Sequence, residues 1–181
     1  MQRVQVVHAS RHGATRGIAE RIVEVLRKRG FDAVIEDAAT KPDPSGFDAY
    51  VIGSGVYMGS WLKEGVEHLE RNVAVLSTRP VWLFSSGPLG TAMVDAKGRD
   101  VLEMTVPGEL AEFERTIHPR EHRAFFGAYD PTSPPIGLRE RGARLAPSDA
   151  LPAGDFRDWP AIEGWAHSIA AVLAPVPAVI G

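Results

Sequence analysis

The chain has 181 residues, of which 44% are hydrophobic, and this is enough for one domain with a continuous core that needs no metal or disulfide. It contains no cysteine, which excludes a disulfide framework, a cysteine nucleophile and thiolate-bound zinc or iron–sulfur centres. The formal net charge of −3, with both signs mixed along the sequence, gives no basic face for nucleic acid.

The first third of the sequence alternates apolar runs with helical periodicity. Residues 1–3 lead directly into a β-like run and lack the features of a secretory signal, so we expect a cytoplasmic protein. A helix is predicted where apolar residues recur every three or four positions from Ile18 to Leu26, and Gly30 should end it. Strands are predicted at residues 4–7, 33–35 and 50–52.

The same alternation continues to the end of the chain. The pattern predicts a helix over 62–73, a strand at 81–84, a weaker helix over 108–116, a strand at 124–126 and a last helix over 162–173. Asp158 is the expected cap of that last helix. The apolar end is interrupted by prolines and is too short to span a bilayer, so we expect no stable membrane insertion.

Five apolar strands with helices between them predict an α/β fold, in which a doubly wound five-stranded parallel sheet of order 2-1-3-4-5 carries helices on both faces. We expect one domain over residues 1–181. The segment of about 130–157 is rich in proline and glycine and shows no period. A long irregular loop of this kind is either a functional flap or a disordered excursion.

Three of the predicted strands end in segments of small and hydroxyl residues, at 9–15, 53–59 and 85–90. Strand order 2-1-3-4-5 reverses direction between strands 1 and 3, and open α/β sheets bind ligands in the crevice at that point. The sequence therefore gathers its glycines and hydroxyls around one predicted ligand site.

The first of these segments has the character of a phosphate cradle. Ser10 and Thr15 offer hydroxyl groups, Gly13 lets the backbone curl, and the following helix contributes free N–H groups and its positive end. The segment has no lysine, so it is not a nucleoside triphosphate loop, and Gly13 with Gly17 does not make the dinucleotide fingerprint. The alternative is an ordinary turn in which Thr15 caps the helix, but three coincident segments favour the cradle.

Residues 10–15 (SRHGAT), 51–59 (VIGSGVYMG) and 158–159 (DW) resemble the flavodoxin-type menaquinone-dependent protoporphyrinogen dehydrogenases, and 154–159 (GDFRDW) is similar to actinobacterial flavodoxin-domain proteins. The likeness covers nearly the whole chain and is weaker over about 91–152. It implies a flavodoxin-like fold that binds FMN without a covalent link. The cofactor-binding residues that it implies are Ser10, Arg11, His12, Gly13, Ala14, Thr15, Ser54, Gly55, Val56, Tyr57, Met58, Gly59, Ser86, Gly87, Pro88, Leu89 and Gly90.

Within that set, the phosphate is expected on residues 10–15 and the flavin ring between residues 54–59 and 86–90. Tyr57 is the better candidate to stack on the ring, whereas Trp61 and Trp82 are expected to pack inside the protein. The six histidines show no metal spacing, so no metal is expected.

These observations favour an FMN-dependent oxidoreductase that moves two electrons between an organic substrate and a quinone or another small acceptor. The cofactor carries that chemistry, so no catalytic acid or base is nominated. Two alternatives stay open: a one-electron carrier that docks with redox protein partners, and a cofactor-free regulatory module. The sequence also leaves open a deazaflavin in place of FMN. Two departures from the relatives bear on this choice. Residues 130–157 lack the basic amphipathic helix of the enzyme family, which speaks against membrane association and a quinone partner, and residues 85–90 lack the aromatic residue of carrier flavodoxins, which speaks against a simple electron carrier.

Overall fold

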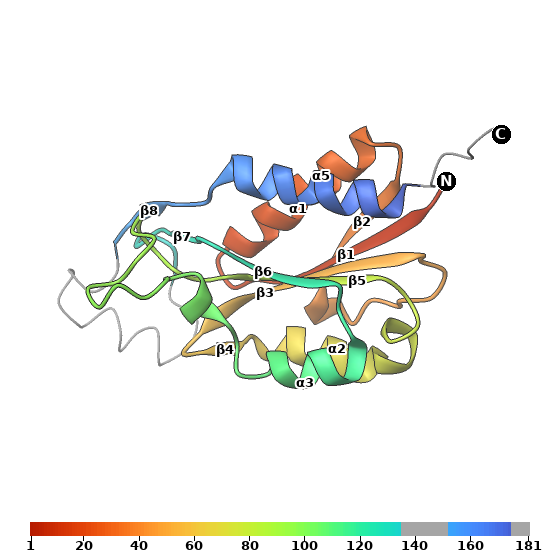
Figure 1. Cartoon of the computed structure of the whole chain (residues 1–181), viewed down its shortest axis with the longest axis horizontal. Helices are drawn as coiled ribbons and strands as arrows, with labels where there is room; N and C mark the ends of the chain where they lie inside the picture. Colours follow the sequence, from red (N-terminus) through yellow and green to blue (C-terminus); the bar gives the residue numbers. More distant parts are fainter. Residues whose placement is uncertain (135–151, 175–181) are drawn as a thin grey trace.

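The computed structural model describes residues 1–134 and 152–174, and shows a central sheet between two layers of helices (Figure 1). The five long strands are parallel and lie in the order β2-β1-β3-β5-β6, which confirms the predicted order 2-1-3-4-5. Their bounds are β1 (Arg3–Ala9), β2 (Asp32–Asp37), β3 (Ala49–Tyr57), β5 (Val81–Ser86) and β6 (Glu121–Phe125). Most of the predicted irregular loop, residues 135–151, lies outside the described residues.

Two helices cover each face of the sheet. In Figure 1, α1 (Ala14–Lys28) and α5 (Trp159–Leu173) lie above it, and α2 (Lys63–Leu76) and α3 (Leu110–Ile117) lie below it. Gly30, at φ 89°, follows the end of α1 as predicted. Asp158 caps α5 by accepting a hydrogen bond of 3.0 Å from the N–H of Ala161, which confirms the predicted cap. Among the described residues, no helix is both long and apolar enough to cross a membrane.

Each helix layer closes its own hydrophobic core against the sheet. Under α1 and α5, the rings of Phe84, Phe125 and Trp165 meet with centroids 5.6–6.4 Å apart. On the other face, Trp61 packs on Phe113 with ring centroids 5.5 Å apart. Burying an aromatic side chain of this size contributes roughly 1.5–3 kcal/mol, so these two clusters fix the helices on the sheet. Trp61 and Trp82 are both buried, as predicted.

The third predicted strand is wrong in its length, because β3 continues through most of the segment that was predicted as a loop. Ser54 pairs with Ala9 of β1 and with Ser85 of β5, and Gly55 pairs with Ser86 of β5, so the strand has a partner on both sides as far as Ser54. Gly53 is not a loop glycine either, since a Cβ there would collide with the ring of Phe84. Met58 and Gly59, both with positive φ, form a two-residue turn into β4 (Ser60–Trp61).

A small antiparallel ribbon closes the base of the predicted irregular loop. It pairs β7 (Ala128–Tyr129) with β8 (Gly154–Asp155), and two short 3₁₀ turns, η1 (Ala38–Thr40) and η2 (Glu103–Thr105), complete the described elements. Beyond the ribbon, Arg157 donates a hydrogen bond of 3.3 Å to the carbonyl of Ala14, pairs with Asp155 at 2.7 Å and lies 4.5 Å above the ring of Trp159. Arg157 thus ties the chain after the ribbon to α1.

We predict that the segment between β7 and β8 can be shortened without loss of the fold. Replacing residues 131–152 by an Asn-Gly turn joins two strands that already face each other, and such a turn suits a two-residue hairpin. The shortened chain should stay soluble and unfold within about 5 °C of the full chain in a thermal melt. Loss of soluble protein would show that the segment belongs to the core.

Unlike the shortened loop, the substitution Arg157→Ala should destabilise the fold, because it removes three contacts of a mostly buried side chain. We expect a loss of roughly 1–3 kcal/mol in the free energy of unfolding. Arg99→Ala is the matched control, since Arg99 pairs with Asp95 at an exposed position and should cost about 0.5 kcal/mol. Equal losses in the two variants would contradict the anchoring role of Arg157.

Candidate functional site

The segments after β1, β3 and β5 lie together at the carboxyl edge of the sheet, as the sequence predicts. Ala9 pairs with Ser54, and Gly55 pairs with Ser86, so the three chain segments leave the sheet as neighbours. The hydroxyl oxygen of Thr15 lies 3.4 Å from the point where a Cβ of Gly55 would be. The first turn of α1 therefore sits directly over the end of β3.

The first segment is a curled turn that leaves the start of α1 open. Gly13 is the N-cap of α1, with φ 87°, and its N–H donates a 3.1 Å hydrogen bond to Oγ of Ser10. No side chain caps the helix, and its first turn contains no acidic residue. The first N–H groups of a helix have no partner inside the helix and carry its positive end. This turn is therefore suited to an anion of phosphate size.

The structure contradicts the alternative in which Thr15 merely caps α1. The cap position belongs to Gly13, and Thr15 lies one residue inside the helix. Its side chain is only 3% exposed and faces the end of β3. A hydroxyl at this position can form a hydrogen bond with a ligand between α1 and β3, but it does not cap the helix.

The second segment presents an aromatic face beside this turn. Tyr57 is 38% exposed at the end of β3, and the guanidinium carbon of Arg11 lies 4.8 Å from the centre of its ring. Met58 follows in the tight turn and is 91% exposed. Arg11 and Tyr57, 46 positions apart in the sequence, thus meet on the side of the predicted phosphate turn.

Ser54 and Val56 have mainly structural surroundings. Oγ of Ser54 is buried, accepts a hydrogen bond of 3.0 Å from the N–H of Leu62 and donates one of 2.9 Å to the carbonyl of Gly55. It therefore fixes the junction between β3 and α2. Val56 is half-buried and lies against Gly87 of the third segment. Whether either residue touches a ligand stays a prediction.

The third segment is tied to the outer strand of the sheet. Gly87 donates a hydrogen bond of 3.3 Å to the carbonyl of Phe125, and the carbonyl of Pro88 accepts one of 2.8 Å from Gly127. Ser86 is buried at its base, while Leu89 and Gly90 are partly exposed at its tip. Gly90 has φ 97° and, like Gly13 and Gly59, faces open space where a Cβ would be.

Residues 91–108 also border this site, which was not predicted from the sequence. Thr105 lies beside Gly87, and the N–H of Gly108 donates a 2.8 Å hydrogen bond to the carbonyl of Gly59. The Pro107-Gly108 pair was the available signal of a turn, but nothing in the sequence placed that turn beside the hairpin. Contact of His12 with a cofactor stays a prediction. In the described part of the chain, no group of three acidic or histidine side chains could hold a metal ion.

Comparison with known proteins identifies the family of this chain. A family model for the flavodoxin domain matches residues 5–129. No curated protein sequence matches the chain significantly. Among solved structures, oxidised flavodoxin 1 from Bacillus cereus superposes with a TM-score of 0.61 at 13% identity, over 96% of this chain and 100% of that chain.

Two further structures have the same fold. A flavodoxin from the domain Archaea gives a TM-score of 0.58 at 16% identity, over 94% of this chain and 98% of that one. Rubredoxin oxygen:oxidoreductase from Desulfovibrio gigas gives 0.59 at 14% identity, over 96% of this chain but only 36% of that protein. Identities this low show the fold alone. The family model, however, covers more than half of the sequence, and the chain therefore belongs to the flavodoxin domain family.

Proposed function

We propose that the chain binds FMN in this crevice and acts as an FMN-dependent oxidoreductase, moving two electrons between an organic substrate and a quinone or another small acceptor. The observation that carries the proposal is the open start of α1, which has no capping side chain and no acid in its first turn. Membership of the flavodoxin domain family supports the choice of FMN. The resemblance to protoporphyrinogen dehydrogenases supports an enzyme, with a substrate of that class as the first to test.

The residues present fit the phosphate end of FMN. The amides of Ala14 and Thr15 and the hydroxyls of Ser10 and Thr15 would hold the phosphate, while the N–H of Gly13 bonds to Ser10 Oγ and fixes the turn. Arg11, whose guanidinium lies over the Tyr57 ring beside this turn, would add a charge-assisted hydrogen bond. The positive end of α1 would stabilise the phosphate dianion without a bound metal ion or a lysine.

The residues around the crevice also fit a flat ring. Gly59 and Gly90 leave open space on either side, and Tyr57 offers an exposed aromatic face for stacking. FMN, when bound, supplies a ring system that accepts and returns electrons. The protein's own contribution is to position that ring and to set the charge around it.

A second candidate is a one-electron carrier without a substrate of its own. It is favoured by exposed methionines near the crevice, since Met58, Met93 and Met104 are 91%, 53% and 52% exposed. Flexible methionine surfaces accommodate different protein partners. The two candidates differ in how the bound cofactor takes up electrons and in what reoxidises it.

The first prediction concerns the phosphate. The protein should bind FMN far more tightly than riboflavin, because several hydrogen bonds to a dianion are lost without that group. Fluorescence titration of both ligands into the same preparation measures the two dissociation constants. Equal constants would contradict the role given to residues 10–15.

Thr15→Val tests the hydroxyl inside that turn, since valine keeps the shape of threonine. Because Thr15 is not the helix cap, we expect FMN affinity to fall by roughly 1–3 kcal/mol while the free energy of unfolding changes by about 1 kcal/mol or less. Thr116→Val is the control, as the hydroxyl of Thr116 bonds only to the carbonyl of Glu112 on α3. A loss of stability without a loss of FMN affinity would restrict Thr15 to a structural role.

A reductive titration separates the enzyme from the carrier. Residues 10–15, 54–59 and 86–90 contain no acid, and Arg11 adds a positive charge. Extra negative charge on a bound cofactor therefore meets less repulsion than it would beside acidic residues. We expect anaerobic titration followed by absorbance to show one two-electron step, with rapid reoxidation by a soluble quinone. Two well-separated one-electron steps and no reaction with quinones would establish the carrier.

A further inference from the structure

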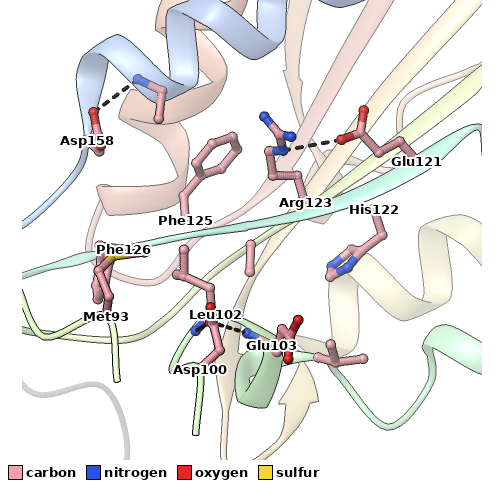
Figure 2. Close-up of a pocket in the computed structure, with 13 residues that line it drawn as sticks. Met93, Asp100, Leu102, Glu103, Glu121, His122, Arg123, Phe125, Phe126 and Asp158 are labelled. Atoms are coloured by element: carbon pink, nitrogen blue, oxygen red, sulfur yellow. Dashed lines mark hydrogen bonds and ion pairs between the residues drawn. The ribbon is translucent and has the colours of Figure 1, made fainter. Parts of the chain in front are cut away.

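A second concave site lies along the outer edge of the sheet, beside β6. It has a volume of about 480 Å³, within the range of small-molecule pockets. Its walls come from β6, from the segment around η2 and from the start of α5 (Figure 2). Gly87 of the third segment is bonded to Phe125 of this wall, so the cavity adjoins the crevice proposed for FMN.

Most of the carboxylates around this cavity are already used by the protein. Asp100 accepts hydrogen bonds from the N–H groups of Leu102 and Glu103, and Asp158 caps α5. Glu121 accepts the indole N–H of Trp165 at 2.8 Å and also pairs with Arg123 at 3.2 Å. These groups shape the walls and leave little capacity to bind a cation.

One side of the cavity is largely apolar, and its polar side chains are His122, Asp100 and Glu103. In Figure 2, His122 lies on the same side of β6 as Leu102 and Glu103, opposite Phe125 and Arg123. By strand alternation, Ala124 and Phe126 share the side of His122. The apolar side chains that line the cavity there are Met93, Leu102, Val106, Ala124 and Phe126.

The hydrogen bonds around His122 favour one of its two neutral forms. The indole N–H of Trp61 donates to Oγ of Ser85 at 2.8 Å, and the same oxygen lies 2.8 Å from Nε2 of His122. The indole can only donate, so Oγ of Ser85 accepts from it and can give its own hydrogen to Nε2 of His122. This arrangement uses the serine hydroxyl fully as donor and acceptor, and we therefore assign the imidazole hydrogen to Nδ1. Burial also lowers the pKa of His122 to about 4, so the ring is neutral near pH 7.

We propose that this cavity binds a neutral, flat aromatic compound whose carbonyl oxygen accepts a hydrogen bond from the Nδ1–H of His122. The apolar walls suit the ring, and the one preset donor suits a carbonyl. The carboxylates of Asp100 and Glu103 disfavour an anion on this side. The role of such a compound as reaction partner of the cofactor rests on the proposed function, whereas its binding does not.

The test compares two ligands that differ only in the carbonyl group. Calorimetric titration of the full chain, without added FMN, uses 1-acetylnaphthalene and the shape-matched 1-ethylnaphthalene. We expect the ketone to bind about fivefold more tightly, the usual net effect of one hydrogen bond. In His122→Phe this preference should disappear, and in His167→Phe, which makes the same change on the exposed side of α5, it should persist.

A second variant guards against loss of folding in His122→Phe, which leaves the Ser85 hydroxyl without its acceptor. Leu102→Trp fills the cavity while the Trp61–Ser85–His122 chain stays intact, so it should abolish binding of both ligands. The proposal would be overturned if the unmodified chain bound the ketone and the hydrocarbon equally well. It would also be overturned if Leu102→Trp still bound both ligands. FMN titration of the same proteins is read separately: failure to bind FMN contradicts the proposed function alone.

Discussion

The open N-terminus of α1 is the feature on which the proposed ligand site depends. Two helices of this chain begin differently, since α5 has a side-chain cap and α1 has none. At α5, Asp158 accepts a backbone hydrogen bond and brings a negative charge to the positive helix end. At α1, the cap is Gly13, no side chain replaces the missing acceptor and no acid follows. Unpartnered N–H groups at a helix end need an acceptor, and at α1 a bound anion is the natural source of one.

The rest of the fold holds that helix end in place over the sheet. Gly53 admits the ring of Phe84 against β3, and Phe84 in turn meets Trp165 of α5. Arg157 joins the chain before α5 to the first turn of α1. Because these contacts are made by buried side chains and backbone groups, the crevice is built before any ligand arrives. A site formed in advance loses less conformational entropy on binding than a site that must be ordered by its ligand.

Much of this arrangement could be predicted from the sequence, and the exceptions have physical reasons. The alternation of apolar runs and helical repeats gave the strand order, and Asp158 before an apolar helix gave its cap. The length of β3 was missed because Gly53, Ser54 and Gly55 look like loop residues until the flanking strands and the Phe84 ring are known. The chain from Trp61 through Ser85 to His122 could not be predicted, since its members lie 24 and 37 positions apart and meet only through the sheet.

Backbone amide chemical shifts are the sharpest test of a phosphate site at the start of α1, because they report on the N–H groups that would bind the phosphate. Two-dimensional ¹H–¹⁵N spectra of the full chain are recorded with FMN and with riboflavin. We expect FMN to move the amide protons of Ala14 and Thr15 strongly downfield and riboflavin to leave them in place. Unchanged amides at these two residues in the presence of bound FMN would contradict a phosphate site at the start of α1.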